Sequence, residues 1–196
     1  MCSDKIVIGM IGLPGSGKTT FANMLIEKAT ARSDKKCLSV VRIGVSDILS
    51  KTLKQYGIEP TRSNLQDLGL FLCKIQYSAV SIAVTNTIIS CPEQVAVFDP
   101  IRTVADYEVL TLFDCHALVY LVTDNDEVRF ERMRDRGQKG EKSKSNNEFR
   151  EAEEHPVELE IQELSSKADY IIPNNSTLDT LRREVVKLMI ILGIIQ

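Results

Sequence analysis

One segment near the start of the chain restricts its fold more than any other. It reads Gly12-Leu13-Pro14-Gly15-Ser16-Gly17-Lys18-Thr19 and fits the pattern G-x-x-x-x-G-K-[ST] at every fixed position. A short apolar run over residues 6–11 precedes it, and apolar residues at three- and four-residue spacing follow it over residues 18–30. A buried strand, a glycine-rich loop and an amphipathic helix in this order predict a phosphate-binding loop.

The residue types in this loop suit a nucleoside triphosphate and a divalent cation. Glycines let successive backbone amides turn toward phosphate oxygens, and the following helix adds the positive end of its dipole. Lys18 is expected to reach the β and γ phosphates, and the Thr19 hydroxyl is expected to ligate Mg²⁺. We therefore expect ATP and Mg²⁺ as cofactors. The predicted nucleotide-binding residues are Gly12, Pro14, Gly15, Ser16, Gly17, Lys18, Thr19, Thr20 and Arg132.

Short strand patterns alternate with helical patterns along the rest of the chain. Strands are predicted over residues 38–43, 94–98, 117–122 and 170–172, and helices over residues 46–56, 63–90, 104–113, 127–136 and 178–192. This alternation predicts right-handed crossovers and a parallel sheet with ligands at the carboxyl ends of its strands. The prediction is an α/β, three-layer P-loop NTPase fold with about five parallel strands and helices on both faces.

Length and composition narrow the function classes. The chain has 196 residues, close to one domain of about 150, so a single P-loop domain over residues 1–196 is expected. The 24 basic and 27 acidic residues leave a net charge of −3, which gives no general attraction for nucleic acid. The longest apolar tract, residues 188–195, is too short to span a membrane. Five scattered cysteines without a Cys-x-x-Cys pair and no visible secretion signal predict a cytoplasmic protein.

A carboxylate and an arginine follow the apolar run at residues 95–98. Asp99 ends this predicted strand beside the loop, where a carboxylate can hold a water on Mg²⁺, so Thr19 and Asp99 are the predicted metal-side residues. Arg102 is expected to open the next helix, where a forked guanidinium can bind the phosphate of an acceptor. The alternative for Arg102 is a solvated residue at the start of a helix.

Four segments carry a resemblance over nearly the whole chain. They are residues 12–19, TRSNLQDLG at 61–69, FDPIR at 98–102 and ADYIIPNN at 168–175. With them the chain resembles the nucleoside monophosphate kinase group, and most of all its adenylate-kinase-related, dephospho-CoA-kinase-like members. The resemblance implies a helical acceptor-binding insert over residues 44–92 and a short lid over residues 132–150.

The resemblance also implies acceptor-side and catalytic residues. Asp47 is similar in position to the residue that orients or deprotonates the acceptor, although a carboxylate that caps the helix is an equal alternative. Arg62 and Gln66 are expected to face the same pocket as Asp47, and together with Arg102 these are the predicted substrate-binding residues. The expected catalytic residues are Lys18, Asp99, Arg132, Arg136 and Asp47.

Three arginines before the lid share one predicted helical face. Arg129, Arg132 and Arg136 lie at three- and four-residue spacing and are expected to approach the triphosphate, with Arg132 and Arg136 favoured. The alternative is a charged outer face on which these arginines pair with acidic neighbours on the same helix.

The sequence also departs from the family pattern. Ser50 and Cys73 stand where relatives carry arginines, and Pro100 replaces a usual glycine. The leading expectation is still phosphoryl transfer from Mg·ATP to a small phosphorylated acceptor, most simply a nucleoside monophosphate. Dephospho-CoA is the alternative acceptor, and a nucleotide-binding switch or ATPase without kinase activity is the alternative class. The expected partner is a small-molecule acceptor, not nucleic acid or a membrane, and the protein is expected to act as a monomer or homodimer.

Overall fold

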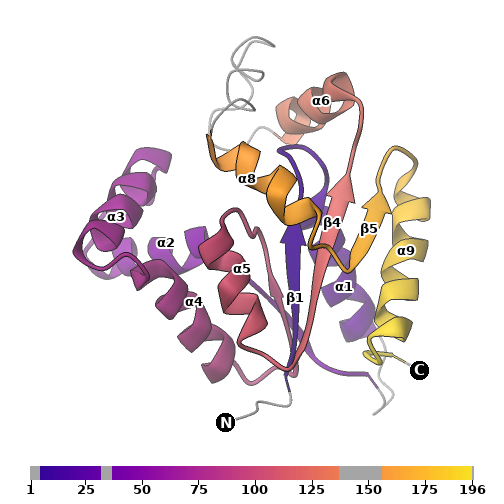
Figure 1. The fold of residues 1–196 in the computed structure, drawn as a ribbon, viewed down its shortest axis with the longest axis horizontal. Coiled ribbons are helices and arrows are strands. Elements are labelled where there is room, and N and C mark those ends of the chain that lie inside the picture. The colour runs from indigo at the N-terminus through magenta and orange to yellow at the C-terminus, as the bar shows by residue number, and fades with distance from the viewer. Residues whose placement is uncertain (1–4, 32–36, 137–155, 196) are drawn as a thin grey trace.

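The computed structural model describes residues 5–31, 37–136 and 156–195 and confirms the predicted five-stranded parallel sheet (Figure 1). The strands lie in the spatial order β2-β3-β1-β4-β5. Their bounds are β1 Ile6–Ile11, β2 Val40–Ile43, β3 Val95–Phe98, β4 Cys115–Val122 and β5 Tyr170–Pro173. Because all five run in one direction, their carboxyl ends meet at one edge of the sheet, where the glycine loop follows β1.

Helices cover both faces of the sheet, as the alternation predicts (Figure 1). Their bounds are α1 Lys18–Ala31, α2 Val45–Gln55, α3 Arg62–Ile75, α4 Ala79–Ser90, α5 Val104–Thr111, α6 Asp126–Arg136, α8 Pro156–Ser165 and α9 Leu178–Ile191. Successive side chains of a strand point to opposite faces. Ile8 and Met10 of β1 therefore join the core formed with α1 and α9, whereas Val7 and Ile11 join the core formed with α4, α5 and α8.

The predicted single helix over residues 63–90 is wrong, because α3 and α4 are separate helices that meet at an angle of 102°. The α3 helix ends where Gln76 adopts extended backbone angles, and no glycine or proline marks the break. Val84 and Ile88 of α4 are buried against the sheet, whereas α3 packs on α2 and α4 instead. Helix α4 therefore lies against the sheet, and α3 packs on the neighbouring helices.

No described helix is by itself both long and apolar enough to cross a bilayer. The bent pair of α3 and α4 meets such a test of length and composition only when the two helices are joined.

Candidate nucleotide site

The glycine loop between β1 and α1 is closely packed at three of its glycines. Gly12, Gly15 and Gly17 have positive φ angles of 147°, 77° and 95°. A Cβ atom at Gly15 would collide with the backbone of Arg129, and one at Gly17 would collide with the side-chain amide of Asn174. Glycine is required at these positions both for its backbone conformation and for the close approach of other elements.

Lys18 lies over this loop. Its Nζ donates to the carbonyl oxygens of Gly12 at 2.5 Å and Leu13 at 2.9 Å, and it lies 3.4 Å from Ser16 Oγ. The Phe21 amide donates to the Gly17 carbonyl at 2.9 Å, which continues α1 directly from the loop. The ammonium group is therefore held at the loop's mouth, beside the positive end of a helix, where an anion is favoured.

Asp99 lies directly after β3 and is 1% exposed. The Thr19 hydroxyl donates to its Oδ2 at 3.1 Å, which joins the two residues predicted on the metal side. The other carboxylate oxygen, Oδ1, is buried and has no hydrogen-bond partner among the described residues. A hydroxyl oxygen and an unsatisfied carboxylate oxygen are hard donors of the kind that Mg²⁺ and its bound waters require, so these residues fit that cation.

Arg42 of β2 joins this cluster, although the sequence reasoning missed it. Its Nε donates to Asp99 Oδ2 at 3.0 Å, and its Nη1 donates to Asp47 Oδ2 at 3.1 Å. The only available signal was a single charged residue in the otherwise apolar strand VVRI. Arg42 therefore connects the predicted metal-side carboxylate to the predicted acceptor-side carboxylate.

Asp47 does not cap its helix. The N-cap of α2 is Gly44, which has no side chain to donate or accept, and Asp47 lies in the first helical turn with 62% of its side chain exposed. An open depression beside it is lined by Asp47, Ser50, Lys51, Lys54 and Gln55. The structure thus pairs Asp47 with Arg42 and leaves it facing solvent.

A second polar network closes the loop from the side of β5. Asn174, which follows β5, donates from Nδ2 to the Ser16 carbonyl at 2.8 Å. Arg132 donates to the Thr123 hydroxyl at 3.2 Å and to the Asn174 carbonyl at 3.1 Å. Partial burial lowers the pKa of Arg132 from its ordinary value, because removal from water disfavours the charged form. An anionic phosphate nearby would offset this cost, since an opposite charge favours the charged form.

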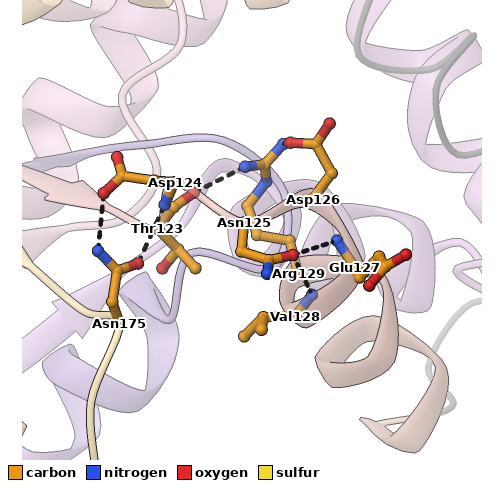
Figure 2. Close-up of polar contacts among 8 residues, drawn as sticks. All are labelled: Thr123, Asp124, Asn125, Asp126, Glu127, Val128, Arg129 and Asn175. Atoms are coloured by element: carbon orange, nitrogen blue, oxygen red, sulfur yellow. Dashed lines mark hydrogen bonds and ion pairs between the residues drawn. The ribbon is translucent and has the colours of Figure 1, made fainter.

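The residues between β4 and α6 form a network of polar contacts with the first turn of α6 and with Asn175 (Figure 2). The backbone of Arg129 in that turn lies against Gly15 of the loop. Asn125 Oδ1 accepts from the amides of Glu127 at 2.8 Å and Val128 at 3.2 Å, which caps the helix. Asn175 in turn holds Asp124 through two hydrogen bonds, from the Asp124 amide at 3.0 Å and to its carboxylate at 2.8 Å. This segment therefore fixes α6 to the end of β5.

Arg129 does not take the role expected from its helical face. It is 4% exposed, and its guanidinium donates to the Thr123 carbonyl at 2.7 Å and pairs with Asp126 at 2.8 Å (Figure 2). These contacts hold Arg129 at the start of its own helix, and its burial does not fit the charged outer face that was the alternative. Arg132, one turn later, lies beside the residues that hold the loop.

The other predicted site residues are less constrained by the described structure. Arg102 precedes α5 instead of opening it, and its exposed side chain forms no hydrogen bond or ion pair with another described residue. Gln66 is exposed on α3. The side chains of Arg62 and Arg136, and residues 137–150 of the predicted lid, lie outside the described part of the chain.

Known proteins agree with this architecture. A family model described as an AAA domain matches residues 8–154. A UPF0200 protein from Aeropyrum pernix is 26% identical to this chain over 92% of this chain and 90% of its own length. A UPF0200 protein from Pyrococcus horikoshii is also 26% identical, over 94% of this chain and 96% of its own length. Among solved structures, TT1252 from Thermus thermophilus superposes with a TM-score of 0.58 at 16% identity over 96% of this chain and 98% of its own. A shikimate kinase from Bacteroides thetaiotaomicron superposes with a TM-score of 0.53 at 16% identity over 95% and 98%.

Proposed function

The chain belongs to the AAA domain family, and from this premise we propose that it transfers a phosphoryl group from Mg·ATP to a small phosphorylated acceptor. A nucleoside monophosphate is the leading acceptor, and dephospho-CoA is the alternative. One observation carries the proposal: Thr19 and Arg42 converge on Asp99 Oδ2 while Asp47 shares Arg42. A second carboxylate connected to the metal-side residues in this way is placed to act on the group that receives the phosphoryl.

Each residue in the proposal has a definite task. The loop amides and Lys18 hold the triphosphate, and Thr19 and Asp99 hold the cation side of the site. Mg²⁺, when bound, neutralises charge on the transferring phosphoryl group. Asp47 orients or deprotonates the accepting group, and its action as a base favours dephospho-CoA, whose accepting group is a ribose hydroxyl. Arg132 and Arg136 balance charge on the triphosphate. Arg62, Gln66 and Arg102 are proposed to bind the acceptor.

A transfer assay tests this function. The full-length protein is incubated with Mg²⁺, γ-labelled ATP and, separately, each nucleoside monophosphate, dephospho-CoA and shikimate. Shikimate is included because some structural neighbours are named shikimate kinases. Label in a monophosphate supports the leading assignment, and label in dephospho-CoA supports the alternative. Binding of Mg·ATP without label in any acceptor would replace the kinase assignment by the switch or ATPase.

Lys18→Ala is the matched loss-of-function variant for this assay. It removes the ammonium that lies over the loop. Charge-assisted hydrogen bonds from this group to the phosphates are worth about 1.5–3 kcal/mol. Without them, an ATP analogue should bind roughly 10- to 100-fold more weakly. Lys28→Ala, in the last turn of the same helix, is the control and should bind normally. Equal affinities of the two variants would contradict the role of Lys18.

The proposal extends to location and partners. Cys37, Cys73, Cys91 and Cys115 are free thiols, as is usual in the reducing cytoplasm. We propose a cytoplasmic enzyme that acts on a small nucleotide-type acceptor as a monomer or homodimer, without a nucleic-acid or membrane partner.

A further inference from the structure

We propose that Arg42 is a positioning residue that sets the orientation of Asp99 toward the metal and makes that orientation depend on Asp47. The inference rests on the proposed Mg·nucleotide site and deepens it, because it gives Arg42 a task of its own in that site. It stands on three contacts: Arg42 to Asp99, Arg42 to Asp47, and Thr19 to Asp99.

The first step concerns the two oxygens of the Asp99 carboxylate. Thr19 from α1 and Arg42 from β2 both donate to Oδ2, so two different elements fix the rotation of this side chain. Oδ1 is buried without a partner among the described residues and is therefore the oxygen left for a metal-bound water. Without Arg42, Thr19 would be the one described side chain that still donates to this carboxylate, and the rotation of Asp99 would be less firmly fixed.

The second step concerns how rigidly Arg42 itself is held. In the parallel pairing of β2 with β3, Ile43 lies opposite Phe98, and the Asp99 amide donates to the Ile43 carbonyl at 3.1 Å. The two interacting side chains therefore project from adjacent strand ends that are joined by backbone hydrogen bonds. Their relative position is set by the sheet, which makes Arg42 suited to fix Asp99.

The third step concerns Asp47. The Arg42 guanidinium reaches both carboxylates because it has separate donors in a planar fork, which a lysine ammonium lacks. A Cβ atom at Gly44 would lie 2.8 Å from Asp47 Oδ2 and 3.4 Å from Arg42 Nη2, so this bridge is packed directly against the backbone. Asp47 therefore helps to hold the guanidinium that holds Asp99, although no hydrogen bond joins Asp47 to Asp99 in the described structure.

A consequence follows for binding. Two sites that share one positioned group have linked affinities, and the linkage is reciprocal. A change at Asp47 is therefore expected to alter metal affinity, and metal binding is expected to alter how firmly Asp47 is held for the acceptor.

The test measures Mg²⁺ affinity by calorimetry. Mg²⁺ is titrated into the full chain, which is saturated with a non-hydrolysable ATP analogue. Arg42→Lys keeps the charge and loses the fork, so Mg²⁺ affinity should fall roughly tenfold, as for other residues that orient metal ligands. Asp47→Asn should also weaken Mg²⁺ binding in the wild-type background and have little further effect in the Arg42→Lys background. Arg182→Lys, in an exposed pair with Asp179 on α9, is the control and should match wild type.

The double variant distinguishes two ways in which Asp47 could affect Mg²⁺ binding: by holding Arg42 in position, or by its own negative charge. If Asp47 acted on the cation only through its field, Asp47→Asn would weaken Mg²⁺ binding equally in both backgrounds, and the inference would be wrong. It would also be wrong if Arg42→Lys bound Mg²⁺ like wild type, while the kinase assignment could stand on its own assay. Wild-type protein that binds the analogue without any dependence on Mg²⁺ would overturn both.

NMR spectroscopy tests the contact directly and shows whether each variant is still folded. The Nε–H signal of Arg42 is assigned in ¹⁵N-labelled protein as the arginine signal that disappears in Arg42→Lys while the backbone spectrum is retained. Because this N–H donates to Asp99, its chemical shift should move when Mg²⁺ is added to the analogue complex and also in Asp47→Asn. An Arg42 signal that is unchanged by both would contradict the bridge.

Discussion

Individual residues in the glycine loop are constrained by neighbours that lie far away in the chain. Gly15 is in contact with the backbone of Arg129, and Gly17 with the side chain of Asn174. The G-x-x-x-x-G-K-[ST] pattern located the loop, but it did not identify these neighbours, because spacing along one segment carries no information about what packs on it. The same limit hid Arg42, whose partner Asp99 is 57 residues away.

Gly15→Ala and Gly57→Ala together test this packing. Both glycines have positive φ, 77° and 70°, but a Cβ atom at Gly57 meets nothing within 4 Å. Left-handed backbone strain predicts a loss of about 1–2 kcal/mol in the free energy of unfolding for each variant. Gly15→Ala should lose about 1 kcal/mol or more in addition, because α6 must shift. Urea unfolding measures both values, and equal losses would show that Gly15 is not packed as described.

At the scale of elements, α5 is held by a capping box. The Thr103 hydroxyl accepts from the Asp106 amide at 3.2 Å, and Asp106 Oδ2 accepts from the amides of Thr103 at 3.1 Å and Arg102 at 3.0 Å. This box fixes the chain just after Asp99. Burial raises the pKa of the Asp106 carboxyl, and the backbone donors only partly offset that effect.

Asp106 therefore predicts a definite pH dependence of stability. Because its pKa is higher in the folded state, the folded chain binds a proton more tightly than the unfolded chain does. The stability from this group is complete below its ordinary pKa of 3.8 and is lost as the pH rises through its folded value. Urea unfolding of wild type and Asp106→Asn at a series of pH values from below 3.8 upward gives the free energy of unfolding of each. This free energy should fall for wild type relative to Asp106→Asn as the pH rises. A difference that stays constant or changes in the opposite sense would contradict the raised pKa.

Most of the order of elements was predictable, but α8 was not among the predicted helices, and some boundaries and contacts were not predictable either. Periodicity located the strands and most helices within two or three residues, because buried strands and amphipathic helices have distinct repeats. It failed at the break between α3 and α4, because Gln76 adopts extended backbone angles there and no glycine or proline marks the position. It also could not separate Arg129 from Arg132, since both share one helical face and only tertiary contacts differ.

On the scale of the whole molecule, the site is assembled from distant parts of the chain. The loop lies between β1 and α1, Arg42 is in β2, Asp99 follows β3, and Asn174 follows β5. The rule that ligands bind at the carboxyl ends of parallel strands predicted their meeting place. The roles of Thr123 and Asn174 were not predictable, because single polar residues at strand ends are common and their partners are set by the sheet order.

Asn174→Ala tests the link between the last strand and the loop. The variant leaves the buried Ser16 carbonyl without this donor, so the free energy of unfolding should fall by about 1–3 kcal/mol and the ATP analogue should bind more weakly. Asn175→Ala, which removes two exposed hydrogen bonds with Asp124, is the neighbouring control and should cost less stability. Thermal unfolding and calorimetry measure both effects. If the two variants had equal stability and equal affinity for the analogue, the proposed link between the end of β5 and the loop would be wrong.

The hydrogen bond from Asn174 to Ser16 joins residues 158 positions apart, and this separation has a consequence for biosynthesis. A ribosome that builds the chain from its N-terminus releases the glycine motif early and the amide that completes it much later. A nascent chain therefore carries the motif before it has a finished pocket. Under the proposed function, ATP stabilises only the completed molecule, and the early stages of folding proceed without it.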